Sequence, residues 1–321
     1  MRKFILNLRS ECNLVSALRC VRRLHPPLSD ETRPMHHSST QVAFETPSLA
    51  CDTHFHVFGT PDRYPYPAEQ LRYTPPVAEI DDYLELAAAL GIQRMVLVQP
   101  SAYGRDNTCM LDAMQSLDPA VRRGIVDIDE NANDSEFARL NALGVRGVRI
   151  NVNPIKPLVP GFSETMRRRI ARLDARCSEL GWSLDFLLPG WLTAELLPDM
   201  KGLRSNFSVA HLGMNLARDG ITTAGFTGLV DLLKHGEGRC WVKLTGTYRI
   251  STQPGFDDIA PLVQTLSQAA PDRLIWGSDY PHLSFAENDT VVLFNLLARW
   301  LPDPALRQKV LVDNPATLYG F

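Results

Sequence analysis

Short apolar runs rich in β-branched residues alternate with amphipathic stretches along most of this 321-residue chain. Eight runs have strand character, namely "ACDTHFHVF", "RMVLVQP", "GIVDI", "RGVRINV", "WSLDFLL", "FSVAHLG", "CWVKLTG" and "RLIWGSD". Such alternation is typical of a parallel sheet covered by helices. Eight strand–helix units fit a (β/α)8 barrel, which usually takes about 250 residues. We therefore predict an α/β protein with a single (β/α)8 TIM-barrel domain over residues 49–321.

Three of the intervening helices have clear ends in the sequence. Each is followed directly by a glycine, which suits the left-handed position after a helix. An open, doubly wound sheet is the alternative fold, but no G-x-G-x-x-G follows the first strand and no P-loop is present. The expected helices cover residues 80–90, 134–143 and 163–180.

The first stretch of the chain differs from the rest. It is rich in arginine and almost free of acidic residues until Asp30, and it then becomes polar with proline and serine. We predict that residues 1–48 form a disordered extension outside the barrel. The alternative is a mitochondrial transit peptide, because an amphipathic basic segment suits that import route. The predicted location is accordingly cytoplasmic, or mitochondrial if the segment is a targeting signal.

The composition excludes several classes of partner. The chain is 45% hydrophobic and 21% charged, with a formal net charge of −3, so it lacks the basic field of a nucleic-acid-binding protein. No stretch approaches the roughly 20 apolar residues that span a bilayer. Six cysteines are scattered without a CxxC pair, which favours a reducing compartment over a disulfide-rich secreted domain. A small molecule is the expected partner.

Polar residues late in the predicted strands indicate a site. His54 and His56 are one residue apart in the first strand, so both side chains point to the same face, into the barrel. His211 ends the sixth strand and Asp279 follows the eighth. Active sites of such barrels lie at the carboxyl ends of the strands. Burying three imidazoles and a carboxylate together is costly unless they satisfy each other, a metal or a substrate.

Arginines form a second group near the same ends. Arg149 lies late in the fourth strand, Arg249 follows the seventh, and Arg105 lies in the loop after the second. A guanidinium matches the geometry of a carboxylate, so these residues indicate an anionic substrate. An ordinary surface ion pair is an equally good interpretation of Arg105, and of Arg146, which alternates away from Arg149.

Three hydroxyl side chains complete the predicted substrate site. Ser101 and Tyr103 share a loop with Arg105 and offer hydrogen bonds to a ligand. Tyr73 lies in the long segment between the first strand and the first helix, from which it can close over the site.

The chain resembles the amidohydrolase superfamily, in particular its branch of 2-pyrone-4,6-dicarboxylate lactonase-like hydrolases. The resemblance rests on "DTHFHVFG", on "HLG" at His211 and on "WGSDYPH" near the end. It extends to "VQPSAYGRDNTCMLDAM", "GVRGVRIN" and "NPATLYGF", which follow in the same order, so it covers nearly all of residues 50–321.

The resemblance implies a lactone hydrolase whose site surrounds the scissile ester carbonyl. Asp279 would act as general base for the attacking water, and His54, His56 and His211 would polarise the carbonyl, with or without a divalent metal. By position, Arg149 and Arg249 would bind the carboxylates of the lactone, and Ser101 would provide a further contact. Zinc, if bound, would be held by the three histidines and Asp279. Branch members use one metal ion or none.

Two departures narrow this expectation. The fourth strand has no bridging lysine or glutamate and the fifth has no histidine, which disfavours a two-metal centre. The loop "SAYGRDN" carries Tyr103 and Arg105, where pyrone-dicarboxylate enzymes tend to have histidine and an uncharged residue.

His282 is expected to orient Asp279 or the following loop. A sugar-acid lactone isomerase, a decarboxylase of the superfamily and a barrel kept only for binding are the alternative functions.

Overall fold

The computed structural model describes residues 40–67, 73–152 and 160–321. Eight parallel strands form one sheet in which each strand pairs with the next along the chain, in the order β1 to β8. The strands are β1 (Cys51–Phe55), β2 (Arg94–Val98), β3 (Arg122–Val126), β4 (Val145–Asn151), β5 (Ser183–Leu187), β6 (Asn206–Val209), β7 (Cys240–Leu244) and β8 (Leu274–Trp276). The predicted (β/α)8 barrel and all eight predicted strands are confirmed.

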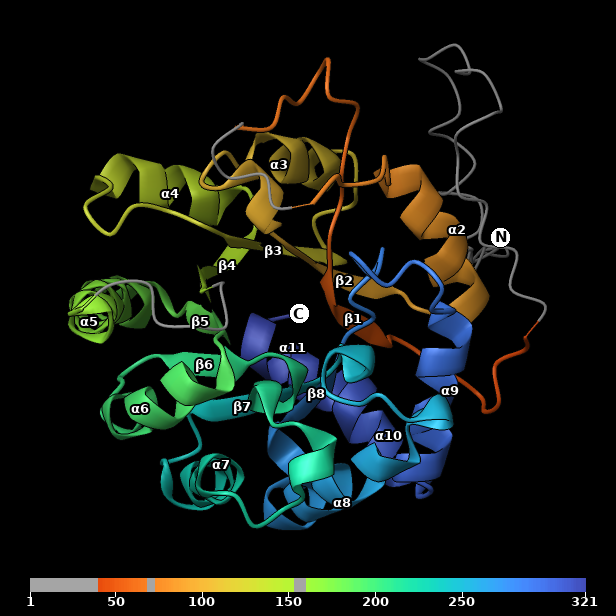
Figure 1. The fold of residues 1–321 in the computed structure, drawn as a ribbon. Helices are drawn as coiled ribbons and strands as arrows, with labels where there is room; N and C mark the ends of the chain where they lie inside the picture. The colour runs from red at the N-terminus through yellow and green to blue at the C-terminus, as the bar shows by residue number, and fades with distance from the viewer. Residues whose placement is uncertain (1–39, 68–72, 153–159) are drawn as a thin grey trace, which may run out of the picture. The chain divides into compact units, whose positions relative to one another are not determined.

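Helices surround the strands, as Figure 1 shows in a view along the barrel. The three helices with predicted ends are confirmed to within one residue at each end. The described helices are α2 (Ile80–Leu90), α3 (Thr108–Gln115), α4 (Asp134–Ala142), α5 (Phe162–Leu180), α6 (Gly190–Lys201), α7 (Ala224–His235), α8 (Ala260–Ala269), α9 (Thr290–Trp300), α10 (Pro304–Gln308) and α11 (Asn314–Tyr319).

The barrel closes between its first and last strands just beyond β8. The backbone N–H of Asp279 donates to the His54 carbonyl at 2.7 Å, and the N–H of His56 donates to the Tyr280 carbonyl at 2.9 Å. Gly277 makes this approach possible, because a Cβ there would lie 2.5 Å from the Cβ of His54. We call this junction the seam, defined by His54, His56 and residues 277–280. The seam brings the two ends of the barrel domain together at the mouth, the carboxyl end of the strands.

The opposite end of the barrel is filled with apolar side chains. α11 lies at the centre of the ring in Figure 1 and places Leu318 and Tyr319 against the strand interior. We call this end the floor. Its strand residues are Cys51, Val96, Val98, Ile125, Trp241 and Ile275, and all are buried.

The segment before β1 contacts the helices from Gln41 onward. The Ala43 N–H donates to Asn295 of α9 at 2.7 Å, the Thr46 hydroxyl donates to the Leu90 carbonyl at 2.7 Å, and the ring of Phe44 packs on Phe294. Residues 41–48 were predicted to belong to a disordered extension, yet these bonds and ring contacts attach them to the barrel. The rest of the predicted extension, residues 1–39, lies outside the described part of the chain.

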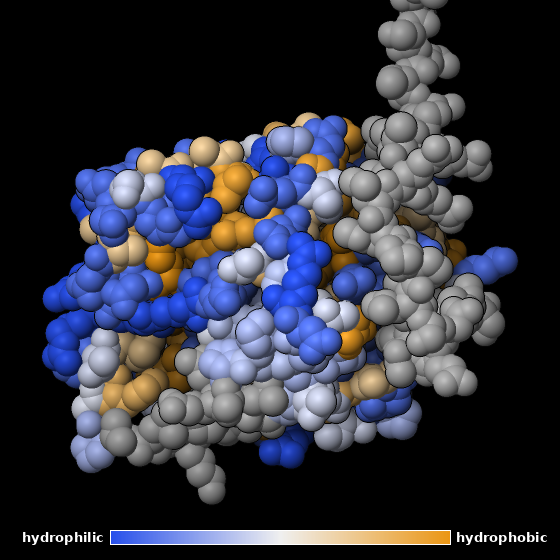
Figure 2. Space-filling view, turned by 90° about the horizontal axis from the view of Figure 1, so that it is seen from above, coloured by the Kyte–Doolittle hydropathy of each residue, from blue (hydrophilic) through white to orange (hydrophobic). Residues whose placement is uncertain are grey.

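Figure 2 shows one face on which hydrophilic residues predominate and hydrophobic residues appear in bands between them. None of the helices in the described ranges has the length and apolar character to cross a membrane. Within the same ranges the four cysteines are buried free thiols. The cytoplasmic location stays a prediction.

Candidate active site

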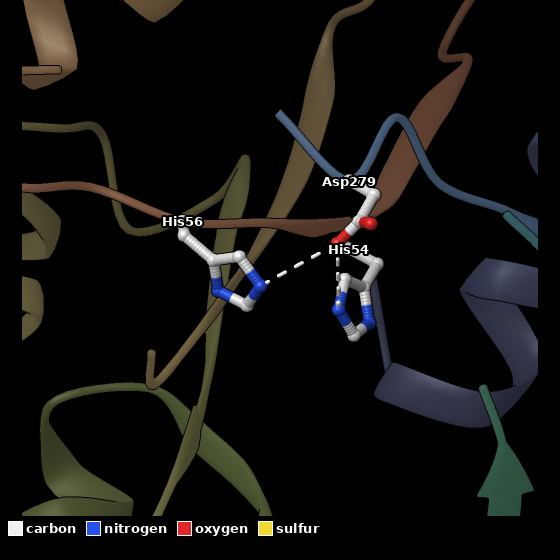
Figure 3. A group of neighbouring side chains, drawn as sticks. All are labelled: His54, His56 and Asp279. Carbon is white, nitrogen blue, oxygen red and sulfur yellow. Dashed lines mark ion pairs between the residues drawn. The ribbon is translucent and has the colours of Figure 1, made fainter. Parts of the chain in front are cut away.

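The predicted histidines and aspartate meet at the mouth of the barrel. His54 Nε2 and His56 Nε2 both lie 3.6 Å from Asp279 Oδ1, and His211 Nε2 lies 4.0 Å from Asp279 Oδ2. Figure 3 shows His54 of β1 and His56, one residue beyond β1, approaching the carboxylate from two sides. All four side chains are at most 4% exposed. The structure therefore brings together residues from the two ends and the middle of the barrel domain.

The local structure of β1 explains how both histidines face inward. Phe55, between them, points to the helix side and stacks on Tyr83 of α2, with ring centroids 3.5 Å apart. The pairing of β1 with β2 shifts register between Asp52 and Phe55. This irregularity lets Cys51 line the floor while His54, three residues later, also points inward.

Asp52 anchors the seam from the helix side. One carboxylate oxygen accepts the backbone N–H groups of His54 and Ser278, each at 3.0 Å, and the other accepts the Tyr83 hydroxyl at 2.9 Å. Burial raises the pKa of Asp52 to about 6. This residue was not predicted as part of the site. It ties the backbone of the first strand to the segment that carries Asp279.

The backbone at His211 and Asp279 is left-handed. Residues His211, Leu212, Gly213 and Met214 have φ values of 52°, 51°, 69° and 55°, and Asp279 has φ 59°. Such a conformation costs an L-residue roughly 1–2 kcal/mol. Gly246 makes room for His211, because a Cβ there would lie 2.3 Å from His211 Nδ1. Strain of this kind persists where the surrounding structure holds it, and it clusters at functional sites.

The two carboxylate oxygens of Asp279 have different surroundings. Oδ2 accepts the Tyr248 hydroxyl at 2.6 Å and the Arg249 Nε–H at 2.8 Å. Oδ1 faces His54 and His56. Burial alone would raise the pKa of Asp279, but Arg249 and the neighbouring donors outweigh it and hold the pKa well below its usual range. Asp279 is thus an ionised carboxylate with one oxygen fixed by donors and one directed at the histidines.

A chain of hydrogen bonds extends behind Tyr248. His282 Nδ1 lies 3.1 Å from the Tyr248 oxygen, and His282 Nε2 lies 2.7 Å from the Thr290 hydroxyl at the start of α9. Since Tyr248 gives its own proton to Asp279, it can only accept from His282, so His282 carries its proton on Nδ1. His282 therefore acts on Asp279 through Tyr248, which agrees with the orienting role predicted for it.

Burial keeps the three site imidazoles neutral. It lowers the pKa of His54 and of His56, and it lowers the pKa of His211 to about 3. Neither ring nitrogen of His211 has a hydrogen-bond partner among the described residues. His211 is thus a buried neutral ring with unused hydrogen-bonding capacity beside the carboxylate.

A cavity of about 230 Å³ opens over this group. His56, His211, Arg149, Arg249 and Asp279 line it, whereas His54 lies beneath them and is not among the lining side chains. Arg149 is buried, its Nη1 donates to the Gln99 carbonyl, and its Nε has no partner among the described residues. The remaining lining residues are mostly apolar and include Leu187, Leu188, Pro189, Met214 and Leu283.

The predicted hydroxyl and loop residues divide into two groups. Tyr73 and Ser101 line the cavity, and their hydroxyls lie 3.3 Å apart. Tyr103 does not line it: its ring stacks on Phe58 and Tyr66, and its oxygen accepts the Gly59 N–H at 3.2 Å.

Arg105 also lies away from the cavity. It forms ion pairs with Asp127, Asp129 and Glu130. The chain makes a 3₁₀ turn over Ser101–Tyr103 and so leads the following residues away from the mouth. Neither Tyr103 nor Arg105 is among the residues that line the cavity, and Arg105 forms the surface ion pairs that were its alternative interpretation; a substrate contact of either residue stays a prediction.

Sequence reasoning missed a buried ion pair beneath the histidines. Lys243 of β7 pairs with Asp185 of β5, and both side chains are fully buried. Ser208 of β6 donates to the same Asp185 carboxylate at 2.9 Å. Burial lowers the pKa of Lys243, while the lysine and its neighbours outweigh burial at Asp185 and lower the pKa of that carboxyl. A lone charge in the middle of an apolar strand was the available signal.

The donor set fits one divalent metal ion. Ligand atoms of His54, His56 and Asp279 lie within 4.8 Å of one another, and two imidazoles with a carboxylate are ligands that zinc uses. His54 Nε2 and both His211 nitrogens lack hydrogen-bond partners among the described residues.

Comparisons with known proteins agree with this geometry. Residues 51–321 match the profile of the amidohydrolase family. The chain belongs to that family. It is 38% identical to a 4-sulfomuconolactone hydrolase of Rhizobium radiobacter, over 88% of this chain and 93% of the relative. It is 30% identical to a 2-pyrone-4,6-dicarboxylate hydrolase of Comamonas testosteroni, over 86% of this chain and 92% of the relative.

The fold is shared with a solved member of the same branch. A putative 2-pyrone-4,6-dicarboxylic acid hydrolase from Pseudomonas putida superposes with a TM-score of 0.71 and is 31% identical, covering 85% of this chain and 97% of that one. The resemblance inferred from "DTHFHVFG", which contains the HxH motif of His54 and His56, and from "WGSDYPH" is thus confirmed for this amidohydrolase.

Proposed function

We propose that this amidohydrolase opens the ring of a small anionic lactone by attack of water. The observation that carries the proposal is an ionised aspartate whose free oxygen faces two imidazoles under a cavity that also exposes two arginines. The relatives named as lactone hydrolases support the same reaction class.

The reaction uses the chain's residues as follows. Asp279 Oδ1 accepts a proton as the oxygen of a water molecule attacks the lactone carbonyl carbon. His211 faces the cavity beside His56, and its N–H donates to the negative charge that develops on the carbonyl oxygen. The ring carbon–oxygen bond then breaks, and the proton held by Asp279 passes to the leaving oxygen. The product is the ring-opened acid.

The two cavity arginines hold the substrate's anionic groups. Arg249 donates its Nε–H to Asp279, and its Nη groups remain to bind a ligand. The buried Nε of Arg149 has no partner among the described residues, and an unpaired buried donor is costly until an anion binds. Ser101 and Tyr73 add hydroxyls at the rim.

A bound zinc ion would polarise the carbonyl as a Lewis acid, held by His54, His56 and Asp279 with His211 beside them. The roles of Asp279 as base and of the arginines as anion ligands do not depend on it.

The test is turnover of a lactone panel that includes 4-sulfomuconolactone and 2-pyrone-4,6-dicarboxylate, with loss of lactone and product mass both recorded. We expect the ring-opened acid, and we expect Asp279→Asn to lower kcat/KM at least about a thousandfold, since an amide cannot accept the proton. Asp219→Asn, a half-exposed aspartate paired with Arg218, is the matched control and should retain activity. A rearranged lactone, released carbon dioxide, or undiminished turnover by Asp279→Asn would overturn the proposal.

A further inference from the structure

Lys243 is a fully buried lysine under the site, and its ammonium has a partner for each proton it carries. Nζ forms the ion pair with Asp185 Oδ2, donates to the Thr53 carbonyl at 3.1 Å, and lies 3.3 Å from His54 Nδ1. A lysine ammonium has three donors and no acceptor. The three neighbours therefore all act as acceptors, including the ring nitrogen of His54.

This contact decides where His54 carries its proton. Because Nδ1 accepts from Lys243, the single proton of the neutral imidazole lies on Nε2. Nε2 faces Asp279 Oδ1 at 3.6 Å. A donor is thus directed at the carboxylate oxygen that the proposed mechanism uses as base.

His56 carries its proton on the other ring nitrogen. Its Nδ1 lies 2.8 Å from the Val98 carbonyl, and since a carbonyl can only accept, the proton of His56 is on Nδ1. The lone pair is then on Nε2, beside Asp279 and the cavity. The two histidines of one HxH motif therefore present different groups to the same carboxylate.

We propose that Lys243 is a positioning residue that holds His54 as the Nε2–H tautomer, so that His54 directs this N–H at Asp279 Oδ1 and metal binding at Nε2 is weakened. Of the three site histidines, His56 and His211 are then the two that face the substrate. The action of His54 on the base rests on the proposed function, whereas the position of its proton does not.

The same contact opposes metal binding at His54. A metal takes the lone pair of Nε2 and would shift the ring proton to Nδ1, where it would point at an ammonium. A metal-bound histidine normally donates its other N–H to a carboxylate or carbonyl, and disturbing such partners changes metal affinity about 10- to 100-fold. His54 has a donor in that place, so Lys243 weakens zinc binding.

The first test reads the tautomers directly in the full-length native chain. The protein is labelled with 15N-histidine, treated with a chelator, and examined by NMR, with His54→Asn and His56→Asn used to assign the two rings. We expect a bare Nδ1 and a protonated Nε2 in His54, and the reverse in His56. A proton on His54 Nδ1, or native protein that retains one zinc ion on His54 Nε2, overturns the proposal.

The second test removes the donor together with its counter-charge. In Lys243→Met/Asp185→Asn we expect His54 to turn its proton to Nδ1, facing the freed Thr53 carbonyl, and zinc to bind at least about tenfold tighter in competition with a chromophoric chelator. Ser208→Ala disturbs the same buried group but keeps Lys243, so it should match the wild type. Equal zinc affinity and an unchanged tautomer in the double variant contradict the proposal.

The tautomer measurement on the native chain decides the matter even if the double variant does not fold. Neither readout requires a substrate. Absence of lactone turnover would therefore refute the proposed function and leave this result standing.

Discussion

At the floor of the barrel, apolar side chains from the strands pack on Leu318 and Tyr319 of α11, whereas at the mouth the same strands carry histidines, arginines and carboxylates. The floor gains free energy from buried apolar area. The mouth costs folding free energy, because Asp279 and His211 are buried polar groups on left-handed backbone.

This difference separates the two tasks of the fold. The floor should be sensitive to loss of volume and indifferent to the chemistry of the substrate. The mouth should respond to changes of geometry and protonation that leave the floor unaffected. Four changes test this division.

The largest effect is expected at the seam. In Gly277→Ala the added Cβ would lie 2.5 Å from His54 Cβ and 2.8 Å from its backbone nitrogen, so strand β1 must move. We expect unfolding free energy to fall by at least about 3 kcal/mol and kcat/KM to fall at least about a hundredfold. Urea unfolding and kinetics measure both. Gly202→Ala, at a glycine with φ −86°, is the control; equal behaviour of the two variants would disprove the strict need for glycine at the seam.

At the floor, Leu318→Ala should lower the free energy of unfolding by about 3 kcal/mol, because it leaves a cavity among packed side chains. Below the unfolding temperature its kcat/KM should stay within about twofold of the wild type. Val292→Ala on the exposed face of α9 should change stability by less than about 0.5 kcal/mol. An activity loss in Leu318→Ala that exceeds its unfolded fraction would show that floor and mouth are coupled.

Acid should destabilise the mouth. Burial lowers the pKa of His211 to about 3, below its unfolded value near 6.5, so between these values the unfolded chain binds a proton that the folded chain does not. Stability is therefore full above pH 6.5 and is lost as the pH falls toward 3. From pH 7 to 5 this histidine alone accounts for about 2 kcal/mol. His211→Asn should flatten the urea-midpoint profile by that amount, and the exposed-site variant His235→Asn should not; a profile unchanged in His211→Asn contradicts the burial argument.

The smallest effect concerns Tyr248. Tyr248→Phe removes the donor to Asp279 Oδ2 and should lower kcat about tenfold with little change in KM, since the carboxylate loses orientation and not substrate contacts. Tyr64→Phe removes a similar hydroxyl that donates to Asp112 outside the cavity, and its kinetics should match the wild type. A rise in KM without a fall in kcat would place Tyr248 in substrate binding.

The sequence predicted those features that recur with a fixed period or adjoin a strand end. Near-continuous apolar runs predicted the strands because both faces of a parallel sheet are buried. The spacing of His54 and His56 predicted their common face, and the strand ends predicted the meeting of His211 with Asp279. These inferences need only local geometry and the known location of sites in barrels.

Contacts that depend on the path of a loop or on the middle of the barrel escaped prediction. The 3₁₀ turn after Ser101 diverts Tyr103 and Arg105, and nothing in their spacing shows it. Lys243 and Asp185 each interrupt an apolar strand with one charge of opposite sign, but their pairing requires the register across β5, β6 and β7.

The seam also has a consequence for how the protein becomes active during synthesis. The Asp52 carboxylate that holds His54 is bonded to the backbone of a residue 226 positions further along the chain. Chains grow from the amino end, so all eight strands are made before residues 277–280, which complete this junction. A nascent or prematurely terminated barrel therefore carries the histidines without their aspartate. Activity therefore requires that the whole barrel has been synthesised and that the seam has closed.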